Sequence, residues 1–405
     1  MTSENDSEVD DDDPDVSDVM DQLDDLRESI DPEADLEPMS PREAREDWLD
    51  RQEEKADSTV RSYEDRTIHF IRFCDREGID DLNDLTTRHI KQYESERLSK
   101  GITESTQKNE WGTLGRMLEH AAKLNAVLPE VAEALDVPEL SKDERVNTET
   151  LPAQRALTIL ENLERYEYAS REHVSFMLIW RTTMRLGAIH GLDLRDLYLE
   201  EDDLGRLRRQ LLEDGYTPAV VDDVIDEAET PFIYPRHRPE SASDTTLKNG
   251  TDGERVINIS DDTAEVLEAY IRVNRHEIED EDGRKPLLTS KKGGGRLADT
   301  SIRNWMYILT QPCNWGGECP HDRDPEECVA REHGRGSKCP SARSPHRIRT
   351  GSYTWHRDKG WPRRDLEEKA NTSLDEVYDQ PFELTRGMSR RQHLDRLDDN
   401  GGDSA

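Results

Sequence analysis

The first 50 residues of this 405-residue chain hold 21 acidic side chains against three basic ones. Residues 1–45 contain no aromatic residue, so they cannot bury enough apolar surface to offset the entropy lost on ordering. We therefore expect residues 1–45 to be a disordered acidic tail. The folded domains must then be built from the rest of the chain.

Apolar residues recur at helical spacing from Ser58 onward, and Gly78 is a plausible stop for that helix. Thr86 is placed to cap a second helix, and a third runs from about Thr103 with one apolar stripe. Together these patterns predict a small helical bundle over residues 46–140.

A charged, proline-containing stretch at 141–152 is expected to be a linker, and a longer mixed region follows it at 153–386. Strands are predicted at 231–234 and 255–259, the second after a turn-rich segment. Helices are predicted at 153–165, 174–180, 204–228, 262–275, 299–309 and 345–360. The predicted fold class is mainly α with a small β component (α+β).

Composition limits the cellular setting. No run of 18 apolar residues exists, and the N-terminus is acidic where a secretory signal would be basic and then apolar. Of five cysteines, four are crowded between Cys313 and Cys339, which favours a reducing interior over a disulfide scaffold. We expect a cytoplasmic protein with no membrane partner. The net charge of −37 also favours a halophilic host.

Residues 335–364 reverse the sign of the charge. Nine Lys and Arg side chains face one acid, Asp358, which gives this basic island a local charge of +8. Such an island in an acidic chain indicates an anionic partner.

Three separated features are informative together. Arg185 follows a buried helical pattern in Thr182-Thr183-Met184-Arg185-Leu186-Gly187. His346 and Arg349 are one helical turn apart in the basic island and therefore share a face. Tyr378 lies about thirty residues further along.

This ordered set resembles the tyrosine recombinase (phage integrase) family, and the local sequence around these residues is similar to that of haloarchaeal integrases. The resemblance covers roughly residues 46–386 and places the family's hairpin lysine on Lys248, before Asn249-Gly250. It implies that 46–140 is a core-binding (SAM-like) DNA-binding domain and 153–386 a catalytic domain, with 387–405 a C-terminal helix and tail. The implied partners are double-stranded DNA and further copies of the chain, as a tetramer in synapsis.

Some positions depart from the family pattern. The family's second His or Trp falls near Lys369, and the interval from Arg349 to Tyr378 is a few residues short. Tyr353, four residues after Arg349, is an alternative nucleophile, although it is so close in sequence that in-line attack is disfavoured. Alternatives to Lys248 as the hairpin lysine are Lys291 and Lys292.

The chemistry of strand exchange explains these residue types. A tyrosine oxygen can attack phosphorus and later leave, so that bond energy is kept in a protein–DNA linkage. Arg185 and Arg349 suit the non-bridging oxygens of the transition state, since guanidinium groups bind them bidentately. Lys248 can protonate the leaving 5′-oxygen, and His346 can hydrogen-bond the phosphate or accept the Tyr378 proton. No catalytic cofactor is required.

Cys313, Cys319, Cys328 and Cys339 lie at intervals of 6, 9 and 11 residues in a polar insertion over 311–340, with histidines between them. Four thiolates can close a tetrahedral structural zinc site. The spacing lacks a C-x-x-C knuckle, so free thiols in a Cys-rich loop are the alternative. A zinc ion there would brace the segment before His346.

The sequence thus predicts a site-specific DNA recombinase that acts through a 3′-phosphotyrosyl intermediate. One alternative is a catalytically defective relative that binds DNA as a zinc-braced protein, which the absent second His or Trp favours. Another is an acidic scaffold that uses residues 1–45 to bind basic partners, which leaves the basic island unexplained.

Overall fold

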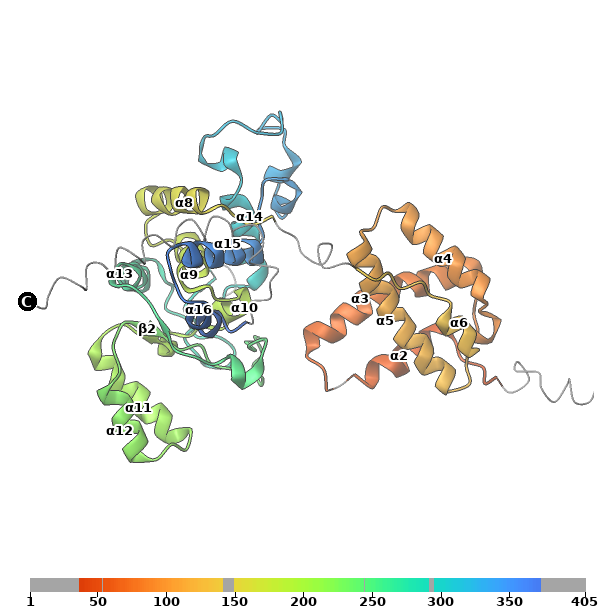
Figure 1. The fold of residues 1–405 in the computed structure, drawn as a ribbon, viewed down its shortest axis with the longest axis horizontal. Coiled ribbons are helices and arrows are strands. Elements are labelled where there is room, and N and C mark those ends of the chain that lie inside the picture. The colour runs from red at the N-terminus through yellow and green to blue at the C-terminus, as the bar shows by residue number, and fades with distance from the viewer. Residues whose placement is uncertain (1–35, 53, 141–148, 244, 291–294, 373–405) are drawn as a thin grey trace, which may run out of the picture. The chain divides into compact units, whose positions relative to one another are not determined.

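The computed structural model describes residues 36–52, 54–140, 149–243, 245–290 and 295–372. Contacts within the chain divide it into two compact units, Met1–Val146 and Asn147–Ala405. Both units are dominated by helices, and the described strands form one three-stranded sheet in the second unit (Figure 1). The predicted fold class, mainly α with a small β component, is confirmed.

The first unit is a helical bundle around one apolar core. The helix predicted after Ser58 is α3, and it ends before Gly78, which adopts the left-handed φ of 73° that favours glycine. Thr86 and Thr103 cap α4 and α5, each accepting a backbone N–H three residues on. The helices are α2 (Pro41–Asp50), α3 (Asp57–Glu77), α4 (Thr87–Ser99), α5 (Glu104–Lys123) and α6 (Pro129–Glu133).

Helix α2 corrects the predicted boundary of the acidic tail. It begins at Pro41 and buries Trp48 and Leu49 in the core, so residues 41–45 belong to the bundle. Ser40 and Glu43 form a capping box, and Pro41 follows the cap. Both features mark the start of a helix in the sequence, but the prediction of the tail relied only on the number of acidic residues. The rest of the predicted tail to residue 35, most of the predicted linker and the predicted C-terminal helix and tail at 387–405 lie outside the described residues.

The second unit packs helices around a small antiparallel sheet of order β1-β2-β3. Leu197 pairs with Ile233, and Ile233 pairs with Ile257. The strands are β1 (Leu197–Tyr198), β2 (Phe232–Ile233) and β3 (Ile257–Asn258). The helices are α8 (Ala153–Tyr166), α9 (Arg171–Thr182), α10 (Leu186–Gly191), α11 (Leu204–Glu213), α12 (Pro218–Asp226), α13 (Asp261–Ala269), α14 (Asp299–Leu309), α15 (Pro345–Asp358) and α16 (Arg363–Ala370). No described helix combines the length and the apolar character needed to cross a membrane.

Helix α9 lies at the centre of this unit, which explains why its sequence is apolar on every face. Phe176, Leu178 and Trp180 are all fully buried. Helix α15 packs directly against α9, and the Ser352 hydroxyl donates a hydrogen bond to the Trp180 carbonyl. The basic helix is therefore fixed to the most buried element of the unit.

Helix α15 also passes very close to the chain at Leu151. An added Cβ atom on Gly351 would lie 2.2 Å from the Leu151 carbonyl oxygen, far inside van der Waals contact. The Leu151 N–H donates to the Arg347 carbonyl in the same contact. Only glycine fits at this point of α15.

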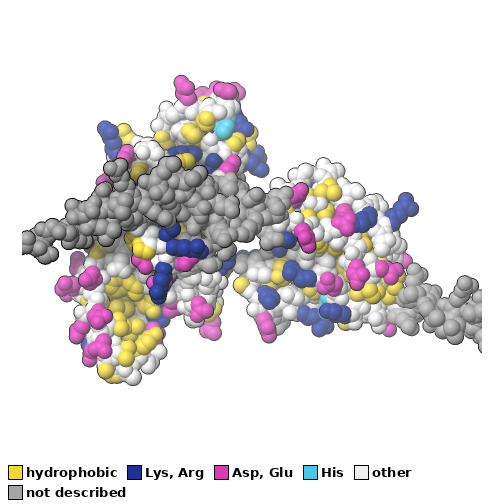
Figure 2. Space-filling view, in the orientation of Figure 1, with side chains coloured by type: hydrophobic (Ala, Val, Ile, Leu, Met, Phe, Trp, Pro, Cys, Tyr) yellow, Lys and Arg dark blue, Asp and Glu magenta, His cyan; other side chains and the backbone are white. Residues whose placement is uncertain are grey.

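Helices α11 and α12 form a lobe between β1 and β2, with a small core of its own. Leu212, Tyr216, Val220 and Val224 remain exposed on it. Figure 2 shows this apolar surface at the lower left, flanked by acidic side chains.

Candidate active site

Arg185 lies at the junction between α9 and α10. Helix α9 ends at Thr182, Thr183 turns the chain with a left-handed φ of 57°, and Arg185 is the N-cap residue of α10. The Thr182 hydroxyl accepts from the Met184 N–H and donates to the Leu178 carbonyl. This turn fixes the direction in which Arg185 leaves the buried helix.

His346 and Arg349 occupy the first turns of α15, which begins at Pro345 behind the N-cap Ser344. The side chain of His346 is exposed at the start of the helix. Partial desolvation lowers the pKa of its imidazole, and the positive charges of Arg349, Lys248 and Arg185 lower it further. The lowered pKa favours the neutral imidazole, which can accept a proton.

Lys248 lies in the loop between β2 and β3, and its side chain is exposed. The adjacent Leu247 is buried, and its N–H donates to His237 Nδ1 at 3.1 Å. The loop is thus anchored immediately before Lys248 while the lysine itself faces outward. The alternative candidates Lys291 and Lys292, and the predicted nucleophile Tyr378, lie outside the described residues.

Three guanidinium groups converge on successive carbonyl oxygens at the C-terminal end of α16. Arg255 Nε donates to Lys369 O at 2.7 Å, Arg349 Nη2 to Ala370 O at 2.7 Å, and Arg185 Nη1 to Asn371 O at 2.9 Å. Carbonyls at a helix C-terminus carry partial negative charge, so they favour cations. A phosphodiester presents the same kind of acceptor with a full charge.

Arg255 was missed by the sequence analysis. Burial lowers its pKa to about 10, and the charge of Arg185 contributes to the shift. The sequence offered one signal, a basic residue at the start of the second predicted hairpin strand. Helix α16 was also missed, because its eight residues are nearly all charged and show no clear apolar period.

Lys369, where the family's second His or Trp was expected, lies over Trp361. Its Nζ is 4.5 Å from the centre of that ring. Burial lowers the pKa of Lys369 to about 8. Lys369 contacts the three converging guanidinium groups only through its carbonyl oxygen, which accepts from Arg255.

Tyr353, the alternative nucleophile, is a packing residue in this structure. It is 5% exposed and packs with Leu366 and Ala370 of α16. Burial raises its pKa well above the usual range, which disfavours the phenolate.

Buried His173 and His356 lead to a prediction about acid stability. Burial lowers the pKa of each to about 4, against about 6.5 in an unfolded chain. Between those values the unfolded state binds protons that the folded state does not, so the free energy of unfolding falls as pH drops from 6.5 to 4. We expect each histidine to contribute up to about 3 kcal/mol to that loss.

Chemical denaturation at several pH values measures this effect. In the folded protein the Ala169 N–H donates a hydrogen bond to His173 Nδ1. The variant His173→Asn keeps a side-chain acceptor for that N–H and removes the titratable group. This variant should show a flatter dependence of unfolding free energy on pH in that window. An unchanged slope would contradict the assignment.

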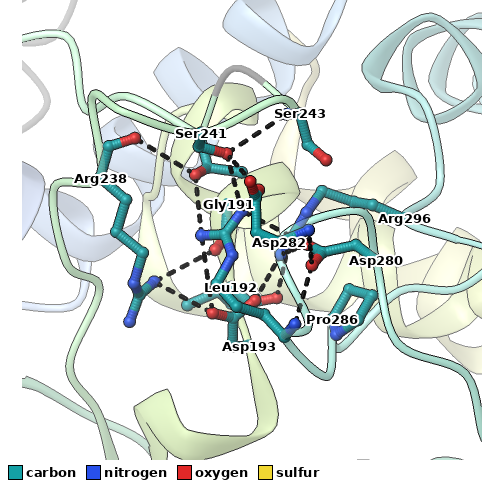
Figure 3. A network of polar contacts seen from close by, with 12 residues as sticks. Gly191, Leu192, Asp193, Arg238, Ser241, Ser243, Asp280, Asp282, Pro286 and Arg296 are labelled. Carbon is teal, nitrogen blue, oxygen red and sulfur yellow. Dashed lines mark hydrogen bonds and ion pairs between the residues drawn. The ribbon is translucent and has the colours of Figure 1, made fainter.

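A network of buried ion pairs fixes the loop that leads to Lys248 (Figure 3). Arg296 bonds the carboxylates of Asp193 and Asp280, and Arg238 bonds Asp196. Arg284 donates to Ser241 and Thr245 in that loop at 2.7 and 3.0 Å. The network ties the segment after α10 to the part of the hairpin loop that precedes Lys248.

The cysteine-rich insertion over 311–340 does not bring its four thiols together. Within the described residues, no three His, Cys, Asp or Glu side chains are arranged to hold a metal ion. Cys328 and Cys339 pack in an apolar cluster with Ala330 and Ala342, and His321 bonds the Ser341 hydroxyl. The set Cys313, Cys319, Cys328 and Cys339 therefore stays a prediction from spacing, which the metal content of the purified protein would test.

The first unit carries a basic groove between α3 and α5, with a volume of about 540 Å³. Arg66 and Arg116 both donate to the buried Thr113 hydroxyl, and Arg116 stacks on Tyr63. Among the residues whose side chains the structure describes, no acidic one lines the groove. Its polar lining comprises Ser58, Thr59, Ser62, Tyr63, Arg66, Lys108, Asn109 and Arg116.

No protein-family model matches the chain, and no curated protein matches it. Solved structures do match. The Tn1549 transposon integrase in complex with a circular intermediate DNA is 13% identical, with 89% of this chain and 99% of that chain covered and a TM-score of 0.55. Lambda integrase bound to DNA is 11% identical, with 85% and 97% covered and a TM-score of 0.52.

A third match is the N-terminal domain of a phage integrase/site-specific recombinase from Haloarcula marismortui. It is 31% identical, covers 25% of this chain and 99% of that chain, and has a TM-score of 0.25. Together with the mainly helical architecture and the three-stranded sheet, the matches to the Tn1549 and lambda integrases show that this chain has the fold of the tyrosine recombinases.

Proposed function

We propose that this protein is a site-specific DNA recombinase that cuts and rejoins duplex DNA through a 3′-phosphotyrosyl intermediate. The observation that carries the proposal is that Arg349 and Arg185 donate to the adjacent carbonyls of Ala370 and Asn371, where the loop that carries Lys248 is also bound. The resemblance of the fold to DNA-bound integrases supports it.

The proposed step is an in-line exchange at phosphorus. The Tyr378 oxygen attacks, its proton passes to neutral His346, the bond from phosphorus to the 5′-oxygen breaks, and Lys248 protonates that oxygen. Arg185 and Arg349 hold the non-bridging oxygens, where negative charge increases in the transition state. Rejoining reverses each transfer, so no external energy source is consumed.

The basic groove of the first unit is proposed to bind the DNA backbone. Its described lining holds three cations and several hydroxyl groups, which suits phosphates in a protein whose net charge is −37. Recombination joins two duplexes, so several copies must assemble on DNA. We propose a halophilic, cytoplasmic setting on the grounds of composition.

A nicked suicide substrate tests the enzyme assignment. Cleavage close to the nick releases a short strand that diffuses away, so the protein stays covalently attached and migrates as a slower band. We expect this adduct on the genuine target site in molar salt. Its absence there, with binding intact, would support the catalytically defective relative, which the lysine at the family's second His or Trp position, Lys369, favours.

The groove gives a separate prediction. Replacing Arg66 and Lys108 by alanine should weaken binding to all duplexes similarly, because these residues would contact phosphates, and should reduce the salt slope by about one for each. Arg42→Ala is a matched control, since Arg42 pairs with Asp75 outside the groove. An unchanged salt slope in the double variant would show that DNA binds elsewhere.

A further inference from the structure

Asn371 joins the end of α16 to the loop that carries Lys248. It closes α16 with a left-handed φ of 46°. Its side-chain oxygen accepts from Asn249 Nδ2, and its side-chain nitrogen donates to the Asp252 carbonyl, both at 2.5 Å. Its own carbonyl accepts from Arg185. One residue thus contacts the hairpin loop twice and the first arginine of the site once.

A helix cap alone does not require asparagine here. Glycine adopts the left-handed region without the steric cost of a Cβ atom, and it is the commonest residue at such helix ends. Asparagine adds an amide with one donor and one acceptor, and both form hydrogen bonds to the loop. These two hydrogen bonds, rather than the left-handed backbone, therefore explain why the residue is asparagine.

Arg255 makes a second connection between the same two segments. Its Nε donates to Lys369 O in α16, and its Nη1 donates to Gly253 O in the loop at 2.8 Å. Asn249 directly follows Lys248, and Asn371 lies seven residues before Tyr378. The loop carries the proposed proton donor, and the end of α16 also accepts hydrogen bonds from Arg185 and Arg349.

We propose that Asn371 is a positioning residue that holds the Lys248 loop in place relative to Arg185 and Arg349 at the end of α16. The inference rests on the proposed function. The two arginines hold the phosphate and Lys248 must reach its leaving oxygen, so the loop must be placed correctly relative to the arginines. The amide of Asn371 fixes this placement from the protein side and makes no contact with DNA.

The variant Asn371→Gly separates this role from the cap. It keeps the left-handed turn and removes both side-chain hydrogen bonds. Single-turnover cleavage is measured on an ordinary substrate and on one with sulfur in place of the leaving 5′-oxygen. A thiolate leaves with little need of a proton, because a thiol has a pKa of about 8.5, far below that of an alcohol. The sulfur substrate therefore bypasses Lys248.

We expect Asn371→Gly to slow cleavage of the oxygen substrate by about 10- to 100-fold, part of what a positioned general acid contributes. The sulfur substrate should recover most of that loss, and DNA affinity should stay unchanged. Asn249→Ala removes one of the two bonds from the loop side and leaves α16 intact. It should act in the same direction, and the double variant should be no slower than Asn371→Gly.

Lys248→Ala separates failure of the inference from failure of the proposed function. If the sulfur substrate does not rescue Lys248→Ala, the assignment of Lys248 as proton donor is wrong. If it rescues Lys248→Ala while Asn371→Gly is either as fast as the unmodified protein or equally slow on both substrates, the coupling is overturned and the proposed function stands. A loss of DNA affinity in Asn371→Gly equal to its loss in rate would also overturn it.

Discussion

Replacing Tyr378 with phenylalanine is expected to abolish the covalent protein–DNA complex while binding to the target duplex stays nearly unchanged. The substitution removes one oxygen atom and keeps the ring, so packing is conserved and the attacking group is lost. Removing a nucleophile of this kind lowers the rate by about 10⁴-fold or more. The adduct on a nicked suicide substrate measures the rate, and a binding titration measures the affinity.

Two further variants complete that experiment. Tyr353→Phe should retain the adduct, because Tyr353 is buried against α16. Arg349→Ala should lose both the adduct and part of the affinity, since its guanidinium would hold the phosphate before and during the reaction. An adduct that persists in Tyr378→Phe and disappears only in Tyr353→Phe would transfer the role of nucleophile to Tyr353.

Gly351→Ala is expected to destabilise the second unit by about 3 kcal/mol or more, at the upper end of the cost of overpacking a core. The added Cβ atom would lie 2.2 Å from the Leu151 carbonyl oxygen. Both partners are main chain, so neither can move away as a flexible side chain would. Helix α15 would have to shift and would displace His346 and Arg349 with it. The midpoint of denaturant unfolding measures the loss.

Gly205→Ala in α11 is the matched control. No atom lies within 4 Å of the Cβ position at Gly205. Alanine in a helix is favoured over glycine by about 0.5–1 kcal/mol, so this variant should be unchanged or slightly more stable. Equal stability of the two variants would mean that α15 and Leu151 are further apart in solution than in the structure.

Helices α8, α9, α13, α14 and α15 and strands β2 and β3 could be predicted because each depends on a local pattern. The apolar run around Phe176 predicted α9, and the turn-rich segment before Arg255 predicted the strand that became β3. Chemistry-bearing residues at a helix junction or on one helical turn, such as Arg185 and the pair His346 and Arg349, could be found for the same reason.

The contacts of Asn371 could not be predicted, because they join residues more than 110 positions apart in sequence through a side chain common at any helix end. The convergence of three arginines on carbonyls of α16 depends likewise on tertiary packing and leaves no periodic signal. The cysteines remain a prediction from spacing. Cys328 and Cys339 lie in one small cluster with Ala330 and Ala342, and the metal content of the protein is the test.

The charged groups of this protein fall into two classes that respond differently to salt concentration. The ion pairs around Asp193 and Arg296 form the buried class. Both side chains are nearly inaccessible to solvent, at 1% and 3% exposure, so mobile ions reach them poorly. In the groove of the first unit, Arg116 is exposed and Arg66 and Lys108 are half-buried, so dissolved ions can screen these charges. Under the proposed function, concentrated salt would therefore weaken DNA binding by the groove and leave the buried ion pairs before Lys248 largely unchanged. Ionic strength would then set how long the protein stays on DNA without changing the rate of the chemical step.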